Sequence, residues 1–412
     1  MPKIHVTNNF NKNVLVLFTG TTLAQAIPIA VSPILTRLYT PEDFGVFAIF
    51  FSITNLLGVV ATWRYELSIV LPSEEDEADL IEYLCFLIAF VFALMLFVLT
   101  LFLNERIASL LGRPDIASWL YLVPLSVFFT GIIQTINYRL NRGRNFREMS
   151  TIKIIQTSSS GVSGIVLGLA RFSLNGLVIS QLFGQLMAIG SRYFKKKIGI
   201  KHRASSVLHI ARKYKNFAMG TPGALLNKAA TSLPIFLMSK LADKNQVGYY
   251  GLVERSIGAP ISLISYSVSQ VLLEEIASRY RMGLPIRSKI LRLSRNLFLV
   301  GIIPFGVLCI FASEIFKFVF GSEWVQAGSY ASVLSIAFFA RFIVSPLSSV
   351  FFSTNSLKKL VLWQVLYFFT TFSIIVYNYF NFEIDAFLIL LVINDLTMYL
   401  FHFVLILSVT KD

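Results

Sequence analysis

The stretch CFLIAFVFALMLFVLTLFL, residues 85–103, decides the fold of this chain. It carries no charged residue, and at about 1.5 Å of rise per residue a helix of this length crosses roughly 30 Å of hydrocarbon. Similar apolar blocks recur along the 412 residues, of which 55% are hydrophobic and 38 are Phe. One soluble core cannot bury that much apolar surface, so the sequence predicts a protein whose solvent is the lipid bilayer.

The apolar blocks predict about twelve transmembrane segments. They lie near residues 14–36, 44–70, 80–103, 117–138, 151–170, 174–193, 216–239, 247–272, 296–313, 328–352, 360–379 and 386–409. Because lipid offers no hydrogen-bond partner to backbone groups, each segment must be a helix, and the predicted fold class is all-α integral membrane. The first block exceeds the roughly 7 to 15 apolar residues of a signal peptide, so we expect it to be a retained helix.

Basic residues are concentrated in alternate joints between the blocks. With the N-terminus in the cytoplasm, 25 of the 36 Lys and Arg residues fall in cytoplasmic joints or tails and seven in outer joints. The positive-inside rule therefore predicts that both termini are cytoplasmic, in a multi-pass protein of a bacterial plasma (inner) membrane. The same rule explains the net charge of +14, so we expect no nucleic-acid partner.

The chain is predicted to consist of two six-helix bundles, residues 1–195 and 216–412, joined by a basic cytoplasmic linker, residues 196–215. A shift of 203 residues aligns Thr36-Arg37-Leu38 with Ser239-Lys240-Leu241, and Phe44-Gly45 with Val247-Gly248. With six helices per half, equivalent helices point the same way, as in transporters with a parallel pseudo-two-fold repeat. Chance similarity between two apolar hairpins is the alternative.

Two motifs carry a family resemblance. PILTRLYTPEDFG, residues 33–45, followed after one helix by RYELSIVLP, residues 64–72, resembles the opening of the polysaccharide transporter family, the O-antigen flippases of Wzx type. This family shares a superfamily with multidrug and toxic-compound extrusion transporters and the lipid II flippase. The resemblance implies a V-shaped pair of bundles that exports an undecaprenyl-diphosphate-linked oligosaccharide, an O-antigen, capsule or exopolysaccharide unit, by alternating access. Membrane lipids, a polysaccharide polymerase and a chain-length regulator are the further candidate partners.

Ionisable residues inside the predicted segments are the candidate site residues, because such residues usually face a bundle interior or a wet cavity. Arginine donates two hydrogen bonds to phosphate oxygens, whereas lysine acts as a point charge. We therefore predict that a substrate diphosphate meets a set of cations, namely Arg64, Arg255, Lys228, Arg37 and Arg341. The alternative is ion pairing within the protein wall, for example between Lys228 and Asp395.

Asp395 lies in the middle of the last predicted helix and is the first candidate for ion coupling, with Glu66 as the second. A buried carboxylate can titrate or hold Na⁺. The sequence shows no phosphate-binding P-loop, and three of its four histidines lie in tails or joints, so we expect neither an enzyme nor a metal or other cofactor. Two alternative functions remain, a cation-coupled drug or metabolite antiporter on the same architecture and a membrane polysaccharide polymerase or ligase.

Overall fold

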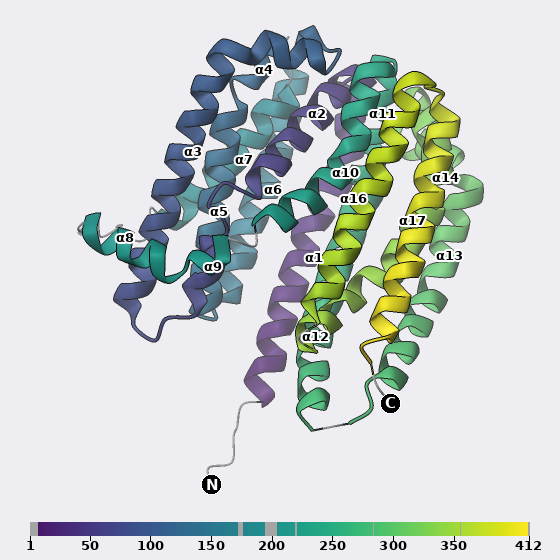
Figure 1. Cartoon of the computed structure of the whole chain (residues 1–412). Coiled ribbons are helices and arrows are strands. Elements are labelled where there is room, and N and C mark those ends of the chain that lie inside the picture. Colours follow the sequence, from purple (N-terminus) through teal and green to yellow (C-terminus); the bar gives the residue numbers. More distant parts are fainter. Residues whose placement is uncertain are drawn as a thin grey trace. The chain divides into compact units, whose positions relative to one another are not determined.

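The computed structural model describes residues 7–171, 176–193, 204–218, 221–282, 284–354 and 356–410. Within these ranges the chain forms helices joined by short turns and contains no strand (Figure 1). The predicted all-α fold is confirmed. By its contacts the chain divides into two compact units, which are described separately below. Unit 1 comprises Met1–Tyr39 with Val46–Lys228, and unit 2 comprises Thr40–Gly45 with Ala229–Asp412.

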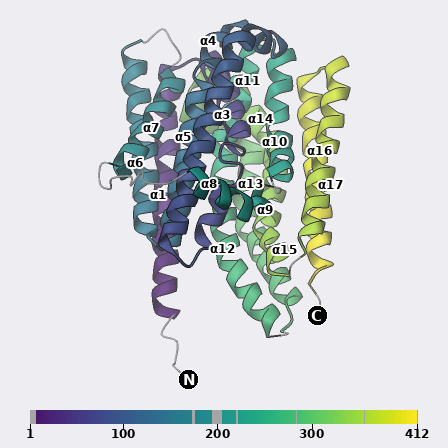
Figure 2. The ribbon, with the colours of Figure 1, turned by 60° about the vertical axis from the view of Figure 1, so that its left-hand side comes forward.

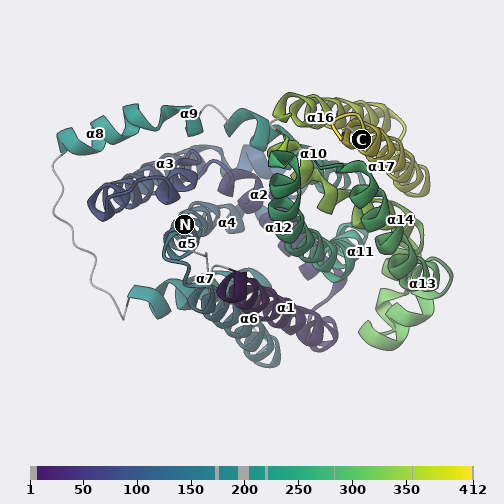
Figure 3. The ribbon, with the colours of Figure 1, turned by 90° about the horizontal axis from the view of Figure 1, so that it is seen from below.

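Unit 1 is built mainly from long helices. They are α1 (Thr7–Leu38), most of α2 (Pro41–Gly58), α3 (Glu75–Leu110), α5 (Val123–Arg142), α6 (Phe146–Leu169) and α7 (Gly176–Tyr193). The shorter elements are α4 (Ala117–Leu120), α8 (Ala204–Lys213), α9 (Lys215–Ala218), the 3-10 turns η1 (Tyr65–Val70) and η2 (Pro114–Ile116), and the start of α10 (Thr221–Leu241). Small residues let helices approach closely here, since a Cβ on Gly161 would stand 3.2 Å from Val31 and one on Gly164 would stand 3.2 Å from Leu35. The α1 and α6 helices therefore run side by side (Figure 3).

Unit 2 contains the rest of α10 and the helices that follow. They are α11 (Lys244–Val253), the π-helical turn η3 (Glu254–Gly258), α12 (Ala259–Arg281), α13 (Arg287–Phe320), η4 (Ser322–Trp324), α14 (Val325–Val344), η5 (Ser345–Ser348), α15 (Ser349–Ser353), α16 (Leu357–Phe380) and α17 (Ile384–Leu407). The last two helices lie side by side (Figure 2). Trp363 and Tyr367 of α16 and Tyr399 of α17 are buried in a core cluster of this unit.

Among the described residues, five helical segments are long and apolar enough to cross a membrane. They are Glu75–Leu110, Arg287–Phe320, Ser322–Ser353, Leu357–Phe380 and Ile384–Leu407, and the bent pair Pro114–Leu120 with Val123–Arg142 makes a sixth. Most of the other predicted segments overlap helices that carry more polar residues, such as the serine-rich α6. On α3 the exposed side chains include Phe90, Leu94 and Phe102, and an apolar face of this size needs lipid around it.

The second predicted segment, residues 44–70, is not one helix. The α2 helix ends at Gly58, and the chain then turns before η1 begins at Tyr65. Trp63 and Arg64 adopt left-handed backbone conformations with φ of 50° and 63°, which a continuous helix does not allow. The prediction was wrong on this point because apolar composition continues through the turn although the backbone changes direction.

The repeated glycines of the sequence meet in unit 2, where the first turn of α2 crosses the first turn of α11. A Cβ on Gly248 would stand 1.8 Å from the Pro41 carbonyl oxygen, and one on Gly45 would stand 2.9 Å from the Lys244 carbonyl oxygen. An ion pair of 2.8 Å between Lys244 and Glu42 closes the same crossing. Only residues without a side chain permit two backbones to come this close.

Candidate functional site

Unit 2 encloses a cavity with a charged wall. The residues that line it come from α10, α11, η3, α14, α16 and α17, and they are Ala230, Thr231, Pro234, Tyr250, Glu254, Leu334, Ala337, Phe338, Arg341, Tyr367, Thr371, Leu391 and Asp395. Two of the predicted site residues, Arg341 and Asp395, therefore share one cavity. The role of each stays a prediction.

Arg341 and Asp395 form the closest charged contact in this cavity. The Nη2 atom of Arg341 lies 3.0 Å from Oδ2 of Asp395, and its Nη1 atom lies 3.9 Å from Oε1 of Glu254. The hydroxyl of Tyr367 donates a hydrogen bond of 2.7 Å to the other oxygen of Asp395. The Nε atom of Arg341 is buried and has no hydrogen-bond partner among the described residues. One donor of the guanidinium is thus unused.

Helical spacing brings these groups together. On α16 the residues Trp363, Tyr367 and Thr371 follow one another at intervals of four, so they occupy one face of the helix. The Trp363 indole donates a hydrogen bond of 2.7 Å to the Met398 carbonyl on α17, and its ring stacks on Tyr367 with centroids 5.3 Å apart. These contacts fix α16 against α17 and so place the Tyr367 hydroxyl beside Asp395.

The charges of the cavity do not balance. Two carboxylates, Glu254 and Asp395, face one guanidinium, that of Arg341. Asp395 is only 8% exposed, and a buried charge without full compensation costs several kcal/mol, on the order of 2.5 to 3.5 at the centre of a membrane helix. A proton or a monovalent cation in this cavity would remove the excess negative charge.

Two of the predicted residues of unit 1, Glu66 and Arg64, lie at the turn between α2 and α3. Glu66 is 6% exposed and accepts a hydrogen bond from the Thr62 hydroxyl. Arg64 precedes η1, is half-buried, and has no carboxylate of the described residues within ion-pair distance. Among the described residues, no carboxylate competes at ion-pair distance with an anion that approaches Arg64.

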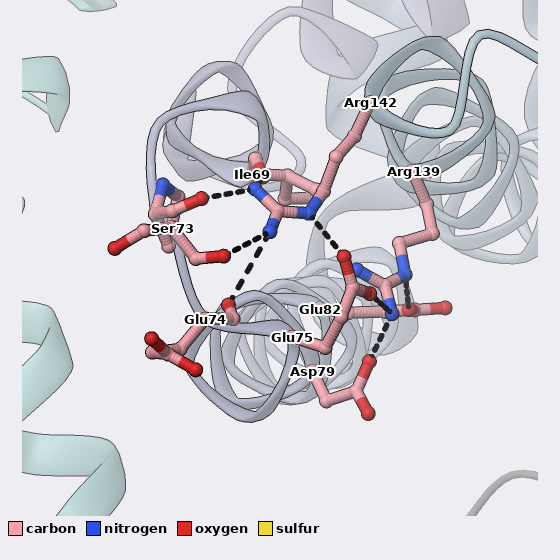
Figure 4. A network of polar contacts seen from close by, with 9 residues as sticks. Ile69, Ser73, Glu74, Glu75, Asp79, Glu82, Arg139 and Arg142 are labelled. Carbon is pink, nitrogen blue, oxygen red and sulfur yellow. Dashed lines mark hydrogen bonds and ion pairs between the residues drawn. The ribbon is translucent and has the colours of Figure 1, made fainter.

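An ionic network holds the ends of α3 and α5 next to this turn (Figure 4). Arg142 donates to the carbonyls of Ile69 in η1 and of Glu74 just before α3, and it pairs with Glu75 at 3.0 Å. Arg139 reaches three carboxylates of α3, those of Glu75, Asp79 and Glu82. The carboxylates at the start of α3 thus pair with the two arginines at the end of α5.

The remaining predicted cations have other surroundings. Arg37 is exposed at the end of α1 and donates a hydrogen bond of 2.6 Å to the Pro33 carbonyl. Lys228 lies half-buried on α10, and Arg255 lies half-buried in the π-helical turn η3. Their contact with a diphosphate stays a prediction.

Sequence reasoning missed Glu254, Tyr250 and Tyr367 as cavity residues. The detectable signal was the interval of four between the aromatic residues Trp363 and Tyr367 in an otherwise apolar helix. Glu254 carried the same signal as Arg341, a charge inside a predicted segment, and the π-helical turn changes which side chains share its face. Among the described residues no group of three or more His, Cys, Asp or Glu side chains could hold a metal ion.

Apolar spanning helices around a charged cavity define the class of protein, an all-α multi-pass membrane transporter. Solved structures of this class have the same fold. A structure titled lipid II flippase MurJ, inward closed conformation, superposes with a TM-score of 0.76 and 16% identity, over 95% of this chain and 87% of that one. An inward-facing multidrug resistance MATE family transporter of the MOP superfamily gives a TM-score of 0.69 and 14% identity, over 95% and 96% of the two chains.

The chain belongs to the family described as polysaccharide biosynthesis protein, which it matches over residues 34–329. This membership confirms the resemblance found in the opening motifs. A relative, the succinoglycan biosynthesis transport protein ExoT of Rhizobium meliloti (strain 1021), is 24% identical over 324 residues, which are 77% of this chain. The match spans 63% of the length of that relative.

Proposed function

We propose that this protein is a flippase, which moves an undecaprenyl-diphosphate-linked oligosaccharide from the cytoplasmic to the outer leaflet of a bacterial plasma membrane by alternating access. The observation that carries the proposal is membership of the polysaccharide biosynthesis family by a chain with a membrane transporter fold. The substrate is an O-antigen, capsule or exopolysaccharide unit, and a polymerase and a chain-length regulator are the partners that would use it. Both termini are cytoplasmic.

In this proposal Arg64, Arg255, Lys228, Arg37 and Arg341 are the cations that meet the diphosphate. Asp395 and Glu66 are the coupling carboxylates. No carboxylate of the described residues lies within ion-pair distance of Arg64, which supports its assignment, because an arginine without a carboxylate partner keeps its donors for a phosphate. The cavity around Asp395 supports coupling, because its charge excess is negative and a cation would neutralise it.

The test uses a strain that lacks the chromosomal copy of the gene and carries variants of the full chain. We expect Arg64→Ala with Arg255→Ala to abolish surface polysaccharide at normal protein levels. Arg147→Ala is the matched control, because Arg147 is exposed at the start of α6 and has no ion-pair partner among the described residues. Normal polysaccharide from the double variant would refute the cationic site.

A second candidate function is a cation-coupled antiporter of drugs or metabolites on the same fold. The two carboxylates of the unit 2 cavity favour it, since an acidic cavity suits a cationic guest. Purified protein in proteoliposomes distinguishes the two: a flippase moves a fluorescent polyprenyl-diphosphate oligosaccharide, whereas an antiporter accumulates an organic cation against an imposed ion gradient.

A further inference from the structure

The turn between α2 and η1 holds two neighbouring residues in an unfavourable conformation. Among the described residues, four that are not glycine have a positive φ, namely Trp63, Arg64, Arg144 and Arg171. Trp63 and Arg64 are the only adjacent pair of these. A side chain in this region places its Cβ too close to the following carbonyl oxygen, so the conformation persists only where the surroundings impose it. Trp63 is 50% exposed, so its own packing does not account for the conformation.

Helix α8 supports this turn from one side. The Tyr65 hydroxyl donates a hydrogen bond of 2.9 Å to the carbonyl of Ala211 in α8. Val207 and Ile210 of α8 are buried in a cluster with Tyr65 and Ile69. The α8 helix lies along α3 in this unit (Figure 3). The residues directly after Arg64 are therefore bound to α8.

Two more contacts fix the segment. Lys213 at the end of α8 pairs with Glu77 on α3, and this contact raises the pKa of the Lys213 ammonium, so the pair stays ionised. The Tyr214 hydroxyl also contacts Glu77, at 3.2 Å. Beyond α9, the Thr221 hydroxyl donates a hydrogen bond of 3.3 Å to the carbonyl of Trp63 itself. The chain from α8 to the start of α10 thus holds both ends of the strained turn.

We infer that α8 and α9 (residues 204–218) act as a strap that holds the Trp63–Arg64 turn in its left-handed conformation and so positions the Arg64 guanidinium for an anionic phosphate group. The inference rests on the proposed function, in which Arg64 meets the substrate diphosphate. Tyr65 and the α8 residues are positioning residues, because they act through Arg64 and do not touch the guest.

The strain itself is tested by thermal unfolding of the full chain with Trp63 replaced by Gly, Asn or Val. Glycine and asparagine accept positive φ, whereas a β-branched residue resists it. We expect Trp63→Gly and Trp63→Asn to melt at or above the wild-type temperature, and Trp63→Val to melt lower by roughly 2–4 °C. Equal melting temperatures for the Gly and Val variants would overturn the strained turn.

The positioning role is tested by a double-mutant cycle on transport of a fluorescent polyprenyl-diphosphate oligosaccharide in proteoliposomes. We expect Tyr65→Phe and Arg64→Ala each to raise the KM at least fivefold, and the double variant to be no worse than Arg64→Ala alone, because Tyr65 acts through Arg64. Tyr377→Phe on the exposed face of α16 is the control. A Tyr65→Phe effect that persists in the Arg64→Ala background would overturn the inference.

Limited trypsin digestion gives a readout independent of transport. We expect Tyr65→Phe to speed cleavage after Arg212, Lys213 and Lys215 several-fold, since α8 would undock more often. Unchanged cleavage overturns the strap. A wild-type protein that transports no lipid-linked oligosaccharide refutes the proposed function instead, and the digestion and melting results then still decide whether α8 holds the turn.

Discussion

Replacing Gly248 with alanine tests how closely α2 and α11 cross in unit 2. The new Cβ would stand 1.8 Å from the carbonyl oxygen of Pro41 and 2.7 Å from its carbonyl carbon. A carbon and a carbonyl oxygen need about 3.3 Å, so the backbones must separate by more than an ångström, and no side-chain rotation can relieve the contact. Overpacking costs about 1–3 kcal/mol, and alanine regains about 1 kcal/mol of helix propensity. Because two backbones must move, we expect a net loss of about 2 kcal/mol.

The matched control is Gly306→Ala in α13, where a Cβ would meet nothing within 4 Å. This change should stabilise the protein by about 0.5–1 kcal/mol through backbone entropy alone. The assay is thermal unfolding of the purified full chain, followed by tryptophan fluorescence. Trp324 reports on the crossing, since its ring lies 4.9 Å from that of Phe44 and 5.9 Å from that of Tyr249. If Gly248→Ala melts as high as Gly306→Ala, the two helices do not cross in this way.

Three further predictions concern charges and caps, each measured by unfolding of the purified protein. Arg341→Ala should destabilise the protein by about 3–5 kcal/mol, because Asp395 is left buried and unpaired. Replacing both residues, with Met and Leu, should recover most of this loss. Equal losses in the single and double variants would contradict the prediction. Arg142→Lys should cost about 1–3 kcal/mol because an ammonium cannot reach several loop carbonyls at once, whereas Arg147→Lys should be neutral. Asn145→Ala should cost about 1 kcal/mol through loss of the α6 cap, and an unchanged melting temperature would show that the hydrogen bond to the Glu148 amide is not needed.

Local patterns predicted the parts of this fold that depend on composition. Apolar blocks gave the membrane class and the approximate place of most long helices, because the energy of burying a segment in lipid is a sum over its own residues. The alignment of Gly45 with Gly248 also marked a real feature, since both glycines lie at the same crossing. A glycine can be recognised from the sequence alone, and its lack of a side chain permits close contact wherever two backbones approach each other.

The break at Trp63 and Arg64 was not predictable in this way. Gly58 ends α2, but neither left-handed position is a glycine, and the conformation is imposed by contacts with residues more than 140 positions away, such as Ala211. Nor did the sequence identify Arg341 as a partner of Asp395; the pair that it offered as an alternative was Lys228 with Asp395. Pairing of buried charges depends on which helices adjoin, and helix adjacency is a property of the whole unit.

The pairing of Arg341 with Asp395 connects two assignments that the sequence treated separately. While Asp395 and Glu254 are both ionised, they hold the guanidinium and leave the cavity negative, so a phosphate approaching Arg341 meets net repulsion. A cation bound at Asp395 would weaken the attraction of its carboxylate for Arg341, and the guanidinium would then have donors to offer. Binding of an anion at Arg341 and of a cation at Asp395 would then favour each other by the same free energy, as linkage requires. In a transporter that binds its substrate at Arg341, the ion pair would itself be the coupling element.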